Sequence, residues 1–139
     1  MKEILVDANV LVSFLTDRNE DQQKMAGALF KGAAQREHAL VLHVISISEA
    51  VYVLRNLYKL DSMEISGAIS RLLTIPGVIS VGEVTWSLVF ERWPQIIPAF
   101  GDAILAAAAG EARYDAVATF DGGLRKKLVK QGSVSYWSG

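Results

Sequence analysis

The sequence predicts a three-layer α/β fold, in which a central, mainly parallel sheet of about four to five strands lies between two layers of helices. Short apolar runs of strand length alternate along the chain with longer segments that repeat apolar residues at helical spacing. Parallel strands joined by right-handed crossovers place helices on both faces of a sheet. The 139 residues, 51% hydrophobic and 21% charged, suit one folded core, so we expect residues 1–139 to form a single domain.

In the first half of the chain, short apolar runs are followed by polar residues that can open helices. The run 4–6 is stopped by Asp7, as expected of a buried strand. The patterns from Ser46 to Glu49 and from Asp61 to Glu64 predict capping boxes that begin two helices. The expected elements are a strand at 4–6, a helix from Val10, a helix over 21–36 with Met25, Ala28, Leu29 and Gly32 on its apolar face, a strand over 39–44, and the two capped helices.

The second half of the chain continues the same alternation. The run 78–81 follows Pro76 and Gly77 and predicts a strand, and Thr85 is a candidate cap for a helix that later prolines interrupt. Asp102 is expected to begin an alanine-rich helix that reaches about Arg113. The remaining expected elements are a strand at 116–119, a helix after Asp121, and an edge strand at 133–137.

Composition excludes several classes of function. The chain has no cysteine, which rules out a disulfide framework, a thiolate zinc site and a cysteine nucleophile, and suits the cytoplasm. Fourteen basic and fifteen acidic residues leave a net charge of −1, so a polyanionic partner must be met by a local patch. No apolar run approaches the length of a membrane span, and we expect no membrane contact. The histidines, His38 and His43, lie in no metal-binding spacing and are interpreted as structural.

Four acids stand where expected strands end or the following helices begin: Asp7, Glu49, Asp102 and Asp121. Ligands of open α/β sheets bind outside the carboxyl ends of the strands, so the fold could bring these acids together. Taken singly, each has a structural explanation as a helix cap or turn residue that contributes about 0.5–2 kcal/mol to stability. As a converging set they would repel one another and raise some of their pKa values, a conflict that a bound divalent metal removes.

The donor chemistry of these acids favours a hard metal ion. Oxygen ligands without cysteine predict Mg²⁺ or Mn²⁺ rather than zinc. A water held by such a metal can attack a phosphodiester bond, which predicts nucleic-acid cleavage. Asn9 offers an amide that can orient Asp7 or the water, and the Thr119 hydroxyl could do the same, although a threonine at the end of a strand is commonly a strand residue only.

The chain resembles the PIN-domain ribonucleases, and within them the VapC-type toxins of toxin-antitoxin pairs. The resemblance covers nearly the whole chain and is carried by its motifs in order: ILVDANVLVSFL at the start, SISEAVYVL around Glu49, FGDAILAAAAGEARYDAV around Asp102, and ATFDGGLRKKL around Asp121. Each motif is weak alone, but their order within one compact chain is fairly specific.

The resemblance implies a metal-dependent endoribonuclease, the toxin of a type II toxin-antitoxin system. It implies that Asp7, Glu49, Asp102 and Asp121 are catalytic, that Asp7, Asp102 and Asp121 hold Mg²⁺ or Mn²⁺ with Glu49 as a further candidate ligand, and that Asn9 and Thr119 support them. It also implies an RNA substrate, a small antitoxin and a homodimer. Some relatives carry another acid before the third site carboxylate, where this chain has Pro98-Ala99-Phe100-Gly101, which leaves one or two metal ions open.

Two further features concern the surface of the protein. The basic run Arg125, Lys126 and Lys127 follows Asp121 and is a candidate RNA contact, although a solvated helix face is the simpler explanation. Trp86 and Trp93, seven residues apart, resemble a packed or dimer-facing helix stripe more than a base-stacking platform. A mean hydropathy of +0.26 is high for a small domain and also favours a dimer.

Two alternative functions stay open at this stage. In a phosphotransferase, Asp7 would accept a phosphoryl group, but such enzymes usually have a second acid where this chain has Asn9. A catalytically silent binding or regulatory module would keep the fold without activity, and the intact set of acids argues against it.

Overall fold

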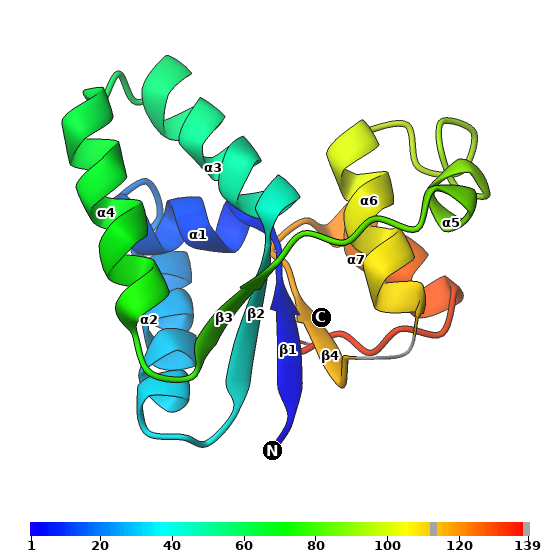
Figure 1. Ribbon diagram of the computed structural model, residues 1–139, viewed down its shortest axis with the longest axis horizontal. Helices are drawn as coiled ribbons and strands as arrows, with labels where there is room; N and C mark the ends of the chain where they lie inside the picture. The colour runs from blue at the N-terminus through cyan, green and yellow to red at the C-terminus, as the bar shows by residue number, and fades with distance from the viewer. Residues whose placement is uncertain (112–113, 138–139) are drawn as a thin grey trace.

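The computed structural model describes residues 1–111 and 114–137 of the chain and confirms the three-layer architecture (Figure 1). A four-stranded sheet has the strand order β3-β2-β1-β4, and every neighbouring pair is parallel. The strands are β1 (Glu3–Val6), β2 (Ala39–His43), β3 (Val78–Val81) and β4 (Ala116–Ala118). Because all strands run the same way, their carboxyl ends meet at one edge of the sheet.

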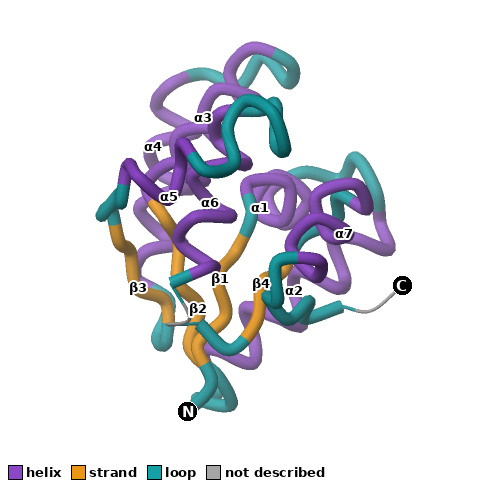
Figure 2. The backbone as a smooth tube through the Cα atoms, turned by 90° about the vertical axis from the view of Figure 1, so that its right-hand side faces the viewer, coloured by secondary structure: helices purple, strands orange, loops and turns teal. Residues whose placement is uncertain are grey.

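Helices cover both faces of this sheet (Figures 1 and 2). The helices are α1 (Ala8–Leu15), α2 (Glu20–Ala34), α3 (Val44–Asn56), α4 (Ser62–Thr74), α5 (Trp86–Phe90), α6 (Phe100–Gly110) and α7 (Gly122–Lys130). In Figure 1, α1 to α4 lie on one side of the sheet and α5 to α7 on the other. Among the described residues, no helix is long and apolar enough to cross a membrane.

The protein has two hydrophobic cores, one on each face of the sheet, because the strands are pleated. Alternate side chains of a strand point to opposite faces, and in β1 Ile4 and Val6 enter the core shared with α1 to α4. Leu5 points the other way and packs with Val41 and Val117 against α6 and α7. Both faces are therefore apolar, as the continuous apolar runs of these strands predict.

Helix α3 begins earlier than the sequence pattern predicts. The pattern places the cap at Ser46, but the helix starts at Val44 and its N-cap is His43, whose Nδ1 accepts a hydrogen bond from the Ile45 amide at 3.1 Å. Ser46 is a buried residue of the first turn, so the predicted capping box is wrong. The second predicted capping box has the correct N-cap residue, because the Asp61 carboxylate accepts hydrogen bonds from the first-turn amides of α4.

Other expected boundaries shift by smaller amounts. In α2 the buried face includes Ala26, Phe30 and Ala33, whereas Met25 and Ala28, which we placed on that face, are exposed. The expected edge strand at 133–137 is only a segment beside β4, joined to it by one bridge between Val117 and Ser135. The described part of α6 ends at Gly110, and the expected continuation to Arg113 lies outside the described residues.

Candidate metal centre and active site

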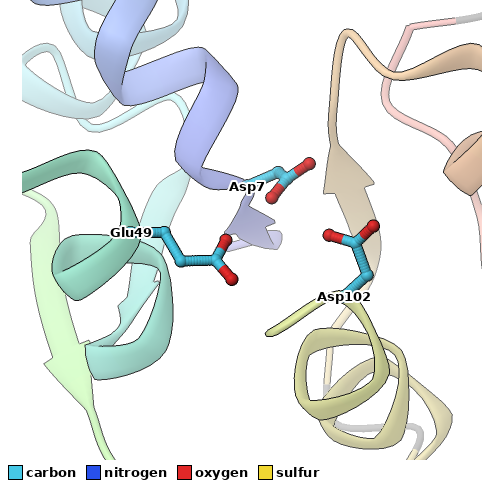
Figure 3. A group of neighbouring side chains, drawn as sticks. All are labelled: Asp7, Glu49 and Asp102. Atoms are coloured by element: carbon cyan, nitrogen blue, oxygen red, sulfur yellow. The ribbon is translucent and has the colours of Figure 1, made fainter. Parts of the chain in front are cut away.

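Three of the predicted acids converge at the carboxyl edge of the sheet. Asp7 follows β1, Glu49 comes from α3 and Asp102 from the first turn of α6, and their side chains point toward one another (Figure 3). One carboxylate oxygen from each lies within 4.8 Å of the other two. The sheet brings Asp7 to the centre, and α3 and α6 approach it from opposite sides.

Asp7 is the most buried of these acids, with 5% of its surface exposed. It caps α1, because its Oδ1 accepts a hydrogen bond of 2.7 Å from the Ala8 amide. Burial raises its pKa from 3.8 to about 6, and the negative charges of Asp102 and Asp121 add to this rise. Hydrogen bonds from Thr119 and Ala8 oppose it in part. The Asp7 carboxylate, expected singly as a turn residue, therefore caps α1 and also lies in the group of acids.

Thr119 organises the polar groups behind Asp7. Its buried hydroxyl donates a hydrogen bond to Asp7 Oδ2 at 2.8 Å and accepts one from the Asp121 amide at 3.0 Å. Asn9 Nδ2 also donates to it at 3.3 Å, and Asn9 Oδ1 accepts from the Phe120 amide at 3.1 Å. These bonds tie the ends of β1 and β4 together and hold one oxygen of Asp7 in place. The structure therefore places Asn9 and Thr119, the two residues expected to support the acids, next to Asp7.

Glu49 and Asp102 also carry raised pKa values. Burial, together with the charges of Asp102 and Asp7, raises the pKa of Glu49 from 4.5 to about 7. Burial raises the pKa of Asp102 too, with a contribution from Asp121, while the positive charge of Lys127 lowers it. Three like-charged groups so close together, each destabilised in its ionised form, match a binding place for a cation.

Asp121 lies outside the three-oxygen group but near it. Its exposed side chain caps α7, with Oδ1 accepting hydrogen bonds from the Gly123 and Leu124 amides at 2.9 and 3.1 Å. Its charge raises the pKa values of Asp7 and Asp102, so it belongs to the same electrostatic neighbourhood. Asp121 therefore caps α7 and also lines the pocket with the other three acids.

A pocket of about 190 Å³ opens over these acids. Its lining includes Arg18, which the sequence did not single out because an isolated arginine in a loop carries no pattern. Arg18 donates hydrogen bonds from Nε to Ser13 Oγ at 3.0 Å and from a terminal nitrogen to the Asn9 carbonyl at 3.0 Å. A hydrogen-bonded cation therefore lines the same pocket as the acids.

The basic run on α7 divides into three different environments. Arg125 donates a hydrogen bond of 2.9 Å to the Thr119 carbonyl, so its guanidinium helps hold the end of β4. Lys127 is half-buried and its positive charge lowers the pKa of Asp102, whereas Lys126 is exposed. Lys127 and Lys130 also line a second pocket, of about 560 Å³, together with Arg92.

Neither the two histidines nor Trp86 and Trp93 are among the residues that line the pocket over the acids. His38 and His43 are buried, and their Nε2 atoms contact the Leu29 and Glu83 carbonyls at 2.7 and 2.9 Å, in agreement with structural roles. Trp86 is half exposed and forms an aromatic surface with three other rings. The members of this aromatic surface are Trp86, Phe90, Trp93 and Phe100, with ring centroids 4.9 to 6.2 Å apart.

A four-stranded parallel sheet between two layers of helices, with acids gathered at its carboxyl edge, defines a three-layer α/β domain with a candidate metal centre. The family model of the PIN domain matches residues 4–128, so the chain belongs to the PIN domain family. No curated protein matches the chain in sequence.

Solved structures share the fold over almost their whole length. VapC20 of Mycobacterium tuberculosis, described as a toxin that cleaves the sarcin-ricin loop, has a TM-score of 0.65 at 18% identity over 94% of this chain and 96% of its own. VapBC2 of Rickettsia felis, solved with a DNA fragment of its promoter, has a TM-score of 0.63 at 12% identity over 98% and 99%. PAE2754 of Pyrobaculum aerophilum has a TM-score of 0.59 at 20% identity over 94% and 89%.

Proposed function

We propose that this protein is a metal-dependent endoribonuclease and the toxin of a toxin-antitoxin pair. The observation that carries the proposal is the meeting of Asp7, Glu49 and Asp102 within 4.8 Å in a chain of the PIN family. Two of the structures with this fold are a VapC toxin that cleaves RNA and a VapBC complex, which supports an RNA substrate and a small antitoxin as partner.

In this proposal Asp7, Glu49 and Asp102 hold Mg²⁺ or Mn²⁺, which supplies a Lewis acid and lowers the pKa of a bound water. Thr119 and Asn9 keep the Asp7 carboxylate turned toward the pocket through the hydrogen bonds described above. Asp121 adds negative charge at the rim. Arg18, which lines the pocket and is held by its hydrogen bonds to Ser13 and Asn9, would contact a phosphate of the substrate.

The test of this function is cleavage of total cellular RNA by purified, antitoxin-free protein, with mapping of the RNA ends. We expect discrete cuts with Mn²⁺ or Mg²⁺, and none with EDTA or in the Asp102→Asn variant. Intact RNA from folded, metal-bound protein would instead favour a silent binding module. Trapping of a phosphate mimic on Asp7 would favour the phosphotransferase.

The environments on α7 predict which lysine contacts RNA. Because the charge of Lys127 acts on Asp102 and Lys126 is exposed, we expect Lys127→Ala to weaken RNA binding and to reduce the slope of log affinity against log salt by about 0.7, the loss of one single-strand phosphate contact. Lys126→Ala is the matched control and should leave the slope unchanged. Equal slopes for both variants and the parent would contradict the assignment.

We place the homodimer contact on the aromatic surface around Trp86. Trp86, Phe90 and Phe100 are 50%, 61% and 40% exposed, which is unusual for clustered large aromatic side chains of a monomer. We expect the parent protein to sediment as a dimer and the Trp86→Glu/Phe90→Glu variant as a monomer. A monomeric parent at micromolar concentration would overturn this part of the proposal.

A further inference from the structure

The first turn of α6 contains a glycine at a costly position. Gly101 is buried and immediately precedes Asp102 within an alanine-rich helix. Glycine is the poorest helix former after proline, and alanine would favour the helix at this position. The first turn must therefore gain something from the absence of a side chain.

The space beside Gly101 is filled by the carboxylate of Glu49. A Cβ atom at position 101 would lie 1.5 Å from Glu49 Oε1, 2.5 Å from Cδ and 3.1 Å from Oε2. These three nearest atoms all belong to the Glu49 side chain, and none belongs to the backbone of α3. The missing Cβ therefore makes room for one particular carboxylate rather than for close packing of two helices.

The position of the Glu49 carboxylate depends on the space beside Gly101, whereas the Asp7 carboxylate is held by hydrogen bonds. Asp7 has a short side chain held by hydrogen bonds from Ala8 and Thr119. Glu49 reaches the cluster from α3 through a longer side chain with more freely rotating bonds, and its carboxylate end rests against the first turn of α6. Its placement therefore depends strongly on the shape of that turn.

We infer that Gly101 is a positioning residue, which keeps the Glu49 carboxylate within the three-oxygen group by leaving room for it beside Asp102. This inference rests on the proposed function for its catalytic consequence. The three atoms nearest to a Cβ at position 101 form the far end of a flexible side chain, so we expect the fold to accept alanine by moving Glu49. We therefore expect Gly101→Ala to leave the stability of the fold nearly unchanged and to displace the Glu49 carboxylate from the site.

The test is the Gly101→Ala variant, with Gly27→Ala as a matched control. Gly27 also lies inside a helix, and a Cβ there would meet nothing within 4 Å. We expect Gly101→Ala to unfold at a temperature no lower than the parent and to lose about 10- to 100-fold in Mn²⁺ affinity, the usual effect of removing support from a metal ligand. Gly27→Ala should keep the parent affinity.

A double-mutant cycle separates positioning from a general structural effect. If Gly101 acts through Glu49, then Gly101→Ala added to Glu49→Gln should cause no further loss of Mn²⁺ affinity. Additive losses, or an unchanged affinity in Gly101→Ala alone, would overturn the inference.

A crystal structure of metal-free Gly101→Ala keeps this test independent of the proposed function. We expect the Glu49 carboxylate to lie outside the group formed with Asp7 and Asp102. If it stays in place, the inference is wrong even where metal binding is lost. If the parent binds no metal while the carboxylate moves in the variant, the proposed function fails and the positioning role of Gly101 stands.

Discussion

We expect Asp7→Asn to reduce metal-dependent RNA cleavage by more than about 100-fold and yet to stabilise the metal-free fold at pH 7.5. The loss exceeds the 10- to 100-fold typical of residues that only support a metal ligand, because Asp7 would itself hold the metal. The gain has a separate cause: an ionised Asp7 is disfavoured by burial, which raises its pKa from 3.8 to about 6 and corresponds to about 3 kcal/mol at pH 7.5.

The amide of asparagine avoids this cost but keeps only one acceptor oxygen. One of the two hydrogen bonds, from Ala8 or from Thr119, is therefore lost at about 1 kcal/mol, and a net gain of about 2 kcal/mol remains. Urea unfolding in EDTA measures this gain. The control is Asp21→Asn on an exposed position of α2, which should change stability by less than about 0.5 kcal/mol. A variant that is less stable than the parent, or that cleaves as fast, would contradict the prediction.

The second large effect is on the pH dependence of stability. The folded pKa values of Asp7 and Glu49, about 6 and about 7, lie above their ordinary values of 3.8 and 4.5. Between about pH 4 and pH 7 the folded chain therefore binds more protons than the unfolded chain. The contribution of these groups to the free energy of unfolding is full below pH 4 and is lost as the pH rises to about 7.

Divalent metal should offset the loss of unfolding free energy at neutral pH, because the metal binds the ionised carboxylates of the folded chain. At 100 times the dissociation constant the metal adds about 2.7 kcal/mol at neutral pH, and it adds little where protons compete for the same oxygens. Urea unfolding at half-unit steps of pH, with EDTA and with Mn²⁺, measures both curves. The Asp7→Asn variant isolates the site and should show a shallower fall in EDTA. Equal slopes in parent and variant would show that other groups cause the pH dependence.

Much of the fold could be predicted from the sequence because its strands are buried on both faces. A buried strand such as β2 is a continuous apolar run, and it is easily found between amphipathic helices. The same argument located the acids, since parallel strands place their carboxyl ends together. The meeting of Asp7, Glu49 and Asp102 follows from topology, and the structure shows it.

The errors arose where a local pattern had more than one physical solution. His43 caps α3 through a ring nitrogen, an uncommon cap that the Ser46 to Glu49 pattern concealed. Asp121 likewise has two roles open to it, because its Oδ1 accepts hydrogen bonds from the amides of α7 while the residue also lines the pocket over the other acids. The choice between those roles depends on side-chain geometry, which spacing along the chain does not contain.

Two contributors to the site carried no detectable signal. Arg18 is a single cation in a loop, and it contributes to the site only because the fold places it in the lining of the pocket. Gly101 becomes significant only when α3 brings Glu49 against it. Both depend on contacts between segments that are distant in the sequence, so a reading along the chain could not find them.

The hydrogen bond between Thr119 and Asp7 joins residues that are 112 positions apart in the sequence, and this separation bears on the synthesis of the protein. The acids come from β1, α3 and α6, and the hydroxyl that orients Asp7 comes from the end of β4. An N-terminal fragment that stops before β4 lacks that hydroxyl, and one that stops before α6 also lacks an acid. A chain that stops before β4 therefore carries no complete site, and under the proposed function it would not cleave RNA before β4 has been added.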